Sequence, residues 1–441
     1  MLTTEHKIGA PAVGAARVLT VLPDFPFPPT TGLHLRIASN LGLVRRLGCF
    51  SAALYFSTER REVHPDRETT LANLCHEVTH GGRRIPHCEV SVGTLLWHKA
   101  DFLIRGAMGL RGTCYPFSMS YDRMGAAERI LTEARRIKAE FVILPSMFLH
   151  YTTKLRGQGF SVVIDASDVL TNLSASFLRG AQSGRGGRLG LFANYLACRS
   201  QERIFLKECI ELWATSAAEV EAFRGITPGV HAIVVPNSLD EEVVRPGAPV
   251  TNPIVGFIGT YSYSPNLEAA SFLAERVFPL MLRTRPDAVL RLAGADLPER
   301  TAAKLRGLQN VEVLGPVADS GEFMNECSVV ALPIFLRGGV PLKLVEAMAR
   351  GKAIVASPEL LEGLGLEDQK ELLIRRKPEE FAAAITALLD DASLRERLGA
   401  NARAHFVQHF SVCSAEAVLR RESVLVYPLR TPAGQGVQHA T

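Results

Sequence analysis

Short apolar runs alternate with longer segments of helical periodicity along most of the chain. Most of these runs stop at a proline, a glycine or a polar residue, which is the pattern of strands buried on both faces. Strands that alternate with helices in this way predict an α/β fold built on parallel sheets. The expected strands are residues 18–22, 50–56, 141–144, 161–164, 211–215 and 233–235 in the first half, and 254–258, 288–292, 311–314, 329–332 and 353–356 in the second.

The length of the chain predicts more than one domain. Its 441 residues exceed the roughly 250–300 that one hydrophobic core usually serves. A linker at residues 246–253, with a proline at each end, separates the two series of strands. We therefore expect a first domain at residues 1–240 and a second at residues 241–412. Residues 413–441 hold an amphipathic helix and then a flexible tail.

The stretch from Phe335 to Ser357 carries the clearest chemical signal. The strand before it stops at Pro333, a glycine turn follows, and apolar residues at helical spacing run to Gly351. This is a parallel βαβ unit, whose helix offers its N-terminal N–H groups to an anion. The residues of interest in the turn and the first helical turns are Gly338, Gly339, Lys343 and Glu346.

Lys343 and Glu346 place an ammonium and a carboxylate beside this anion site. Such a pair suits a ligand with both phosphate and hydroxyl groups, such as a nucleotide sugar. Lys343 and the helix N-terminus near Gly339 would also stabilise a departing diphosphate. The alternative is a plain connection between strand and helix, because many glycine turns bind nothing and Lys343 would then be a solvated surface residue.

Glycine or polar residues follow three other expected strands, at the edge where open α/β sheets bind ligands. Glycine allows the backbone to approach a ligand closely, and a carboxylate at this edge can make a polar contact with a bound substrate. A plain connection, or an aspartate that caps the next helix, explains the same residues. They are Gly32 after 18–22, Asp165 and Asp168 after 161–164, and Gly259, Thr260 and Asn266 after 254–258.

Composition and charge exclude several classes of protein. The net charge of +4 is too balanced to indicate a nucleic-acid-binding protein. The eight cysteines include no C-x-x-C pair, which argues against a metal cluster or a disulfide framework and is typical of a reducing cytoplasm. We see no signal peptide and no run of the roughly 18 apolar residues that spans a bilayer. These features predict a soluble or peripheral protein.

Residues 90–111 mix apolar and basic side chains. This mixture is typical of a helix at a membrane surface, or of one that shapes an acceptor pocket. A core helix with a few solvated charges explains it as well. The apolar members are Leu95, Leu96, Trp97, Phe102, Leu103, Ile104 and Met108, and the basic ones are Lys99, Arg105 and Arg111.

The segment GGVPLKLVEAMARGKAIVAS resembles the C-terminal signature of the retaining GT-B glycosyltransferases, in particular family 4 (glycosyl transferases group 1). The resemblance implies two Rossmann-like domains that face each other across a cleft. A nucleoside-diphosphate sugar would bind the second domain and a glycan or lipid-linked acceptor the first, and the last helix would cross back to the first domain. Retention, no cofactor, a role in bacterial polysaccharide synthesis and possible contact with the inner membrane face are also implied. Since no Asp-x-Asp motif stands where metal-dependent transferases use one, we expect no metal ion.

The resemblance also suggests roles for single residues. Glu346 matches the glutamate that holds the ribose hydroxyls of the donor. The family's other glutamate falls at Gly338 and its histidine at Ser167, so both groups are absent here. Segments around Gly259 and Val317 resemble the loops that meet the donor phosphate and the nucleobase. The candidate catalytic residues are Asp165, Asp168 and Lys343, and the candidate donor-binding residues are Gly32, Gly259, Thr260, Asn266, Val317, Gly338, Gly339, Lys343 and Glu346.

Two other functions fit the same donor site. A GT-B sugar-nucleotide epimerase or hydrolase would need an acid–base set in the first domain. A non-catalytic nucleotide-sugar-binding or scaffold protein is suggested by the two missing groups. Product analysis without an acceptor identifies the first, and binding without turnover identifies the second.

Overall fold

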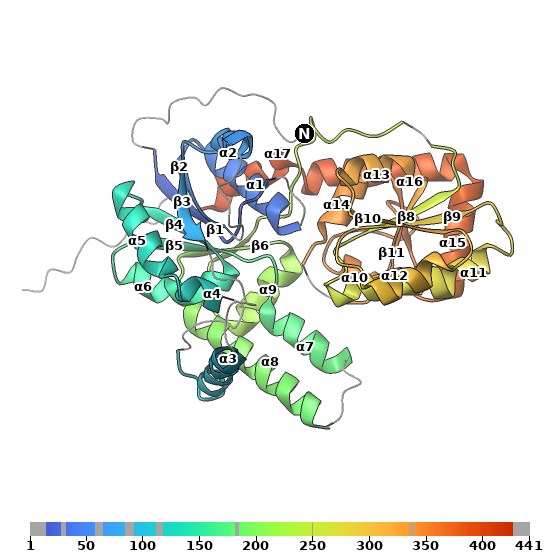
Figure 1. Cartoon of the computed structure of the whole chain (residues 1–441). Helices are drawn as coiled ribbons and strands as arrows, with labels where there is room; N and C mark the ends of the chain where they lie inside the picture. Colours follow the sequence, from blue (N-terminus) through green and yellow to red (C-terminus); the bar gives the residue numbers. More distant parts are fainter. Residues whose placement is uncertain are drawn as a thin grey trace, which may run out of the picture.

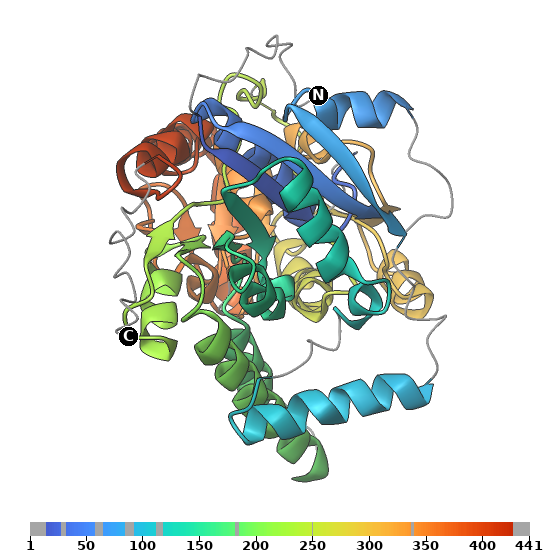
Figure 2. The same cartoon turned by 90° about the vertical axis from the view of Figure 1, so that its left-hand side faces the viewer.

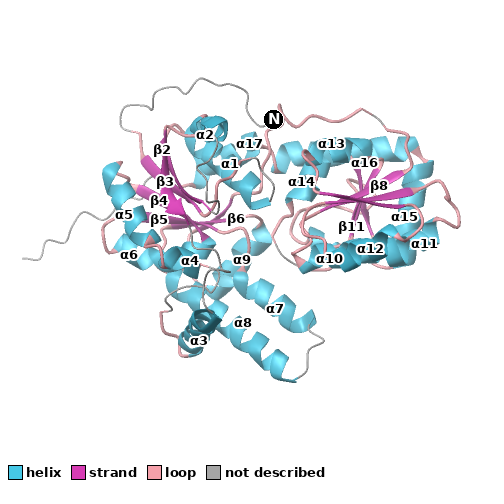
Figure 3. Cartoon of the chain, in the orientation of Figure 1, coloured by secondary structure: helices cyan, strands magenta, loops and turns pink. Residues whose placement is uncertain are grey.

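The computed structural model describes residues 15–27, 32–57, 65–83, 92–111, 118–180, 185–248, 250–336 and 339–426. It has two lobes, each with one sheet and helices on both of its faces (Figures 1 and 3). Every strand pair in both sheets is parallel. The predicted α/β fold with two parallel sheets is confirmed.

The first sheet has the strand order β3-β2-β1-β4-β5-β6-β7. The order reverses between β1 and β4, which is the doubly wound Rossmann arrangement. The strands are β1 (Arg17–Leu22), β2 (Phe50–Ser57), β3 (Glu77–Arg83), β4 (Phe141–Pro145), β5 (Ser161–Asp165), β6 (Glu211–Ala214) and β7 (Ala232–Val234). The helices are α1 (Gly32–Arg46), α2 (Pro65–Ala72), α3 (Val92–Ala107), α4 (Met119–Asp122), α5 (Ala126–Arg136), α6 (Thr152–Arg156), α7 (Leu170–Gly180), α8 (Arg185–Phe205) and α9 (Ala217–Ile226).

The second sheet has the order β10-β9-β8-β11-β12-β13 and reverses between β8 and β11. Its strands are β8 (Ile254–Ile258), β9 (Val289–Ala293), β10 (Val311–Gly315), β11 (Val329–Leu332), β12 (Ala353–Ala356) and β13 (Leu373–Ile374). The helices are α10 (Ser264–Phe272), α11 (Phe278–Met281), α12 (Glu299–Arg306), α13 (Ser320–Glu326), α14 (Leu342–Ala349), α15 (Pro378–Asp390), α16 (Ala392–His409) and α17 (Val412–Glu422).

The apolar strand runs arise because both faces of each sheet are covered. In β1, Leu19 and Val21 enter one hydrophobic cluster, while Val18 and Leu22 enter clusters on the opposite face. Alternate side chains of a strand point to opposite faces, so helices on both sides require an apolar residue at every position. The second domain has one large cluster built around its central strands.

The last helix, α17, packs against the first domain. Leu419 lies in the same cluster as Val18, and α17 lies beside α1 (Figure 1). The fully buried carboxylate of Glu211 accepts hydrogen bonds from Ser423 Oγ (2.7 Å) and from the backbone N–H of Val424 (2.8 Å). The end of the described chain is therefore fastened to the first sheet.

Several element boundaries differ from those predicted. No strand was expected between residues 56 and 141, yet β3 lies there and is a polar strand at the sheet edge. The glycine-rich residues 185–190 form the first turns of α8, a helix that packs against α3 and α7. The helix that begins at Ser264 is followed by a π-helical turn at Leu273–Val277. Residues 427–441 lie outside the described part of the chain.

Candidate active site

The donor side of the site lies at the carboxyl ends of the strands of the second sheet. The sheet order reverses between β8 and β11, and ligands of doubly wound sheets bind in the crevice at such a point. The chain leaves β8 at Gly259, and it leaves β11 toward α14, which carries Lys343 and Glu346. The predicted donor residues are therefore gathered by the topology at one edge.

Lys343 reaches back across the end of β8. Its Nζ donates a hydrogen bond to Asn266 Oδ1 (2.7 Å) and lies 4.5 Å from the centre of the Phe257 ring. Asn266 Nδ2 in turn donates to the carbonyl oxygen of Thr260 (2.8 Å). A Cβ at Gly259 would lie 2.6 Å from Lys343 Nζ, so only glycine leaves room for the ammonium. Lys343, Asn266, Thr260 and Gly259 thus form one connected group, as the sequence predicted.

Burial controls the charge of Lys343. Removal of the ammonium from water, without a carboxylate partner, lowers the pKa of Lys343 to about 7. An anion bound beside the ammonium would replace the lost hydration and return the pKa toward its usual value.

Three glycines form a shelf without side chains along the same edge. The N–H of Gly259 donates to the carbonyl of Ala293 (3.1 Å), and the N–H of Gly294 donates to the carbonyl of Gly315 (2.7 Å). Gly294 has a φ of +131°, and a Cβ there would lie 1.9 Å from the oxygen of Gly259. Gly294 was not among the predicted residues. A side chain is excluded there by the backbone that follows the neighbouring strand β8, which the local sequence does not show. Val317, predicted to meet the base, is half-buried in the loop after β10.

Glu346 lies one turn after Lys343 and faces α13. The residue is 8% exposed, and Ser320 Oγ contacts both carboxylate oxygens at 2.9 Å and donates its hydrogen bond there. Arg350 Nη2 is 3.4 Å from Oε1. Burial raises the pKa of Glu346, while Ser320 and Arg350 oppose the rise. Neither Ser320 nor Arg350 was predicted, since the sequence offers no signal that links α13 to α14.

The turn before α14 is bound to the first domain. Gly339 N–H donates to Asp168 Oδ1 (2.9 Å), and Val340 N–H donates to Thr215 Oγ1 (3.3 Å). Asn237 Nδ2 donates to the carbonyl of Val340 (2.6 Å). A Cβ at Gly339 would lie 2.3 Å from the oxygen of Ser167, so the two backbones touch.

We call these contacts of Gly339 and Val340 the interdomain seam. In this structure the N–H of Gly339 donates to Asp168, so a donor phosphate would have to displace that hydrogen bond in order to use it. Gly338 lies outside the described residues. Gly32, the first residue of α1, faces α14 across the same seam, where a Cβ would lie 3.5 Å from Leu342 Cδ1.

Residues 252–391 match the family model of glycosyl transferases group 1. The chain is similar to sucrose-phosphate synthase from Thermosynechococcus elongatus (14% identity, TM-score 0.67, 94% of this chain and 99% of that chain covered). It is also similar to HepE from Anabaena in complex with UDP-glucose (15%, 0.62, 92% and 98%). A glycosyltransferase from Rickettsia africae is similar too (11%, 0.58, 94% and 99%). No curated protein sequence matches the chain.

Likeness at this level of identity establishes the fold. The predicted GT-B arrangement of two Rossmann-like domains is confirmed. The match covers the strands and helices that carry Gly259, Lys343 and Glu346. Together, the sequence match and the fold support an enzyme of the glycosyltransferase class.

The two predicted aspartates differ in their surroundings. Asp168 lies at the seam, where burial raises its pKa and the charge of Arg36 opposes the rise. Asp165 instead pairs with Arg36, which is 1% exposed and donates to Asp165 Oδ1 from Nε (2.9 Å). Asn40 Nδ2 donates to Asp165 Oδ2 (2.9 Å). Both oxygens of Asp165 are occupied, so this geometry favours Asp168 over Asp165 as a substrate contact.

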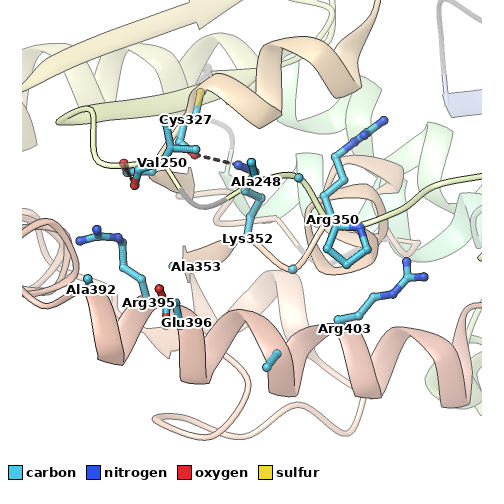
Figure 4. A pocket seen from close by; sticks show the side chains of 15 residues that line it. Ala248, Val250, Cys327, Arg350, Lys352, Ala353, Ala392, Arg395, Glu396 and Arg403 are labelled. Atoms are coloured by element: carbon cyan, nitrogen blue, oxygen red, sulfur yellow. Dashed lines mark hydrogen bonds between the residues drawn. The ribbon is translucent and has the colours of Figure 1, made fainter.

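A pocket of about 390 Å³ lies away from this site, at the opposite ends of β11 and β12 (Figure 4). Its lysine and two of its arginines bond to backbone carbonyls. Lys352 Nζ donates to the carbonyls of Asn325 (3.0 Å) and Cys327 (3.1 Å). Arg395 donates to that of Leu388 (2.6 Å), and Arg403 to that of Val244 (2.6 Å). Since these cations join α13, α15, α16 and the residues before the linker, the pocket is a structural joint.

In the part of the chain that the structure describes, no group of three or more His, Cys, Asp or Glu side chains is placed to hold a metal ion. Among the described helices, none has the length and apolar character needed to cross a membrane.

Proposed function

We propose that the protein transfers a sugar from a nucleoside-diphosphate sugar to a glycan or lipid-linked acceptor. The donor binds the second domain, the acceptor binds the first, and no metal ion takes part. The observation that carries this proposal is the pair on α14, with Lys343 directed to the end of β8 and Glu346 directed to α13. An ammonium and a buried carboxylate one turn apart match the phosphate and the ribose of one nucleotide.

The donor chemistry follows from these two groups. Lys343 supplies a point charge for the diphosphate at the end of β8. Glu346 accepts hydrogen bonds from Ser320 in the free protein, and ribose hydroxyls are donors of the same kind. The similar HepE structure holds UDP-glucose, which supports a donor of this class.

In the transfer step, negative charge develops on the leaving diphosphate. Lys343 stabilises that charge, and because burial lowers its pKa to about 7, a nearby anion favours its protonated form. We propose retention of configuration, with the leaving phosphate oxygen taking the proton of the acceptor on the same face of the sugar. Asp168 approaches from the first domain and contacts donor or acceptor. Packing of the two domains limits the access of water and thus hydrolysis.

We place this reaction in the synthesis of a bacterial surface polysaccharide or a lipid-linked oligosaccharide. A scaffold that binds nucleotide sugars without turnover is the second candidate. The observation that favours it is Ser167, where the resemblance leads one to expect a histidine near the donor sugar.

The donor site is tested by a thermal-shift panel with UDP, GDP, ADP and their sugars. We expect one nucleotide to raise the melting temperature. At one hundred times its Kd, the nucleotide would stabilise the folded state by about 2.7 kcal/mol. Glu346→Gln should abolish the shift. Its amide N–H₂ is a hydrogen-bond donor, and it would face a ribose hydroxyl that donates to the carboxylate in the wild type. Glu322→Gln, an exposed carboxylate on α13, is the matched control and should keep the shift.

Several outcomes would contradict the proposal. If millimolar concentrations of every nucleotide leave the melting temperature unchanged, there is no competent donor site. Binding without product formation for any acceptor would favour the scaffold. Conversion of the nucleotide sugar without an acceptor would favour an epimerase or a hydrolase.

A further inference from the structure

Three helices form an arm that projects from the first domain. Figures 1 and 2 show α3, α7 and α8 extending away from the sheet. Helix α8 packs against both α3 and α7. At the crossing of α3 and α8, a Cβ on Gly106 would lie 2.4 Å from the Cβ of Ala197, so the helices are in close contact. The arm is therefore a packed unit with an inner and an outer face.

The outer face of α3 is apolar although it faces water. Leu96 and Ile104 lie on one side of the helix, eight residues apart, and Trp97 adjoins them. Met108 continues this side directly after the end of α3. The exposed fractions of these four side chains are 62%, 58%, 60% and 67%, respectively, whereas Phe102 on the inner side is 2% exposed. A helix that only covers a core is polar on its outer side. An exposed apolar stripe of this kind indicates a partner.

The other two helices extend the apolar surface. Among the described residues, fourteen large apolar side chains are exposed, and nine of them lie on the arm or directly after α3. The concentration on three helices out of the whole chain shows that this exposure is local. The nine are Leu96, Trp97, Ile104, Met108, Leu110, Phe177, Leu189, Phe192 and Leu196.

The arm is also strongly basic. Residues 92–111, 170–180 and 185–205 contain eight Lys or Arg and two Asp or Glu, a surplus of six in a chain whose net charge is +4. Both acids are occupied: Asp101 pairs with Arg105 (2.6 Å), and buried Glu202 accepts the backbone N–H of Leu170 (2.8 Å). Lys99 is exposed beside the apolar stripe. The charge of the arm therefore complements an anionic surface.

We propose that this arm docks the protein on the surface of an anionic lipid bilayer. The apolar stripe would enter the boundary between headgroups and acyl chains, to a depth of about 5–10 Å, while the basic groups meet lipid phosphates. Trp97 is of the aromatic type enriched at that boundary. A second copy of the chain fits less well, because contact between two such arms would bring surpluses of the same charge together. The inference does not depend on the proposed transfer reaction.

Vesicle binding of the full chain tests this proposal. We would use phosphatidylcholine vesicles with and without phosphatidylglycerol, at low and at physiological ionic strength. The chain has two tryptophans, and Trp213 is fully buried, so a blue shift of the emission would report on Trp97. We expect co-sedimentation and a blue shift with the anionic vesicles, with weaker binding as salt rises.

Substitution of the stripe gives the matching variant. Trp97→Ser combined with Ile104→Ser changes exposed positions and should lower vesicle partitioning about tenfold or more, with nucleotide binding unchanged. Val407→Ser, an exposed apolar position on α16, is the control and should bind vesicles as the wild type does. Equal binding by the stripe variant would overturn the proposal. The proposal would also be overturned if the wild-type protein bound neither vesicle type, including a case in which the stripe drives self-association.

Discussion

At the scale of single residues, Lys343 dominates the donor site. It is a half-buried lysine whose ammonium contacts an amide oxygen, Asn266 Oδ1, and the face of the Phe257 ring. Neither carries a full negative charge, so burial lowers the pKa to about 7 and leaves the group partly neutral near that pH. Occupancy by an anion and protonation of Lys343 are therefore linked.

This linkage predicts a pH dependence of nucleotide affinity. A bound diphosphate raises the pKa of Lys343, so binding takes up a proton once the pH exceeds about 7. Affinity should therefore fall between about pH 7 and pH 9, by up to about tenfold per unit. Lys343→Met should bind the nucleotide more weakly, and its affinity should depend less steeply on pH. Lys304→Met, on the surface of α12, should match the wild type. Titration calorimetry over this range measures both quantities, and an identical slope in Lys343→Met would contradict the assignment.

The sequence predicted the part of the site that lies in local motifs. Gly259, Asn266, Lys343 and Glu346 each follow a strand or open a helix, and a short window of sequence contains that information. The partners of Glu346 were not predictable in this way. Ser320 is 26 residues from Glu346 in sequence, and only the packing of α13 beside α14 brings the two side chains together.

At the scale of elements, a buried ion pair joins α1 to β5. Arg36 and Asp165 are 129 residues apart, and Arg36 also donates to the carbonyl of Val235 (3.0 Å) and to Asn237 Oδ1 (3.0 Å). The sequence shows Arg36 only as a lone arginine four residues after Gly32. It could not show the partner, because the pair depends on which helix covers the sheet beside β5.

Removal of one member of this pair should destabilise the first domain. Arg36→Met leaves the carboxylate of Asp165 buried without its cation, which typically costs about 3–5 kcal/mol. The double variant Arg36→Met with Asp165→Leu should lose less than the sum of the single changes, since no unpaired charge remains. Urea denaturation of the four proteins measures this coupling. Additive losses would show that the pair does not stabilise the contact between α1 and β5.

Element boundaries were predicted well where strands are buried on both faces and poorly at the margins. Central strands such as β4 and β11 are fully apolar, so their pattern is unambiguous. β3 is a half-exposed edge strand, and its sequence EVTHGGR has neither an apolar run nor strict alternation. The first turns of α8 contain three glycines in six residues, RGGRLG, a composition whose local preference is for a loop, and residues 187–190 are exposed there.

At the scale of the whole molecule, the seam decides how the two domains meet. Its hydrogen bonds join residues 103 to 171 positions apart in sequence. No local pattern predicts such contacts, and in the sequence Gly339 pointed to a phosphate rather than to Asp168. The seam ties the start of α14, and with it Lys343, to the first domain. A ligand that moves α14 would therefore also move the domains relative to each other.

Gly339→Ala should separate domain closure from donor binding. The added Cβ would lie 2.3 Å from the oxygen of Ser167, so the seam must open, while Lys343 and Glu346 remain on the same helix. We expect nucleotide affinity near that of the wild type, a lower kcat and a larger radius of gyration in solution scattering. Gly225→Ala, on α9, is the control because a Cβ there meets nothing within 4 Å. An unchanged radius and an unchanged kcat would show that the seam does not hold the domains together.

Asp168→Asn then distinguishes two roles for Asp168, which are contact with the substrate and positioning of the turn before α14. Asparagine keeps an oxygen that can accept the N–H of Gly339, so the seam and the radius of gyration should be preserved. The substitution removes the charge of a carboxyl group whose pKa is already raised by burial. If kcat falls while scattering stays unchanged, Asp168 acts on the substrate. If kcat is retained, the residue serves only to position the turn before α14, and the proton of the acceptor goes to the leaving phosphate without its help.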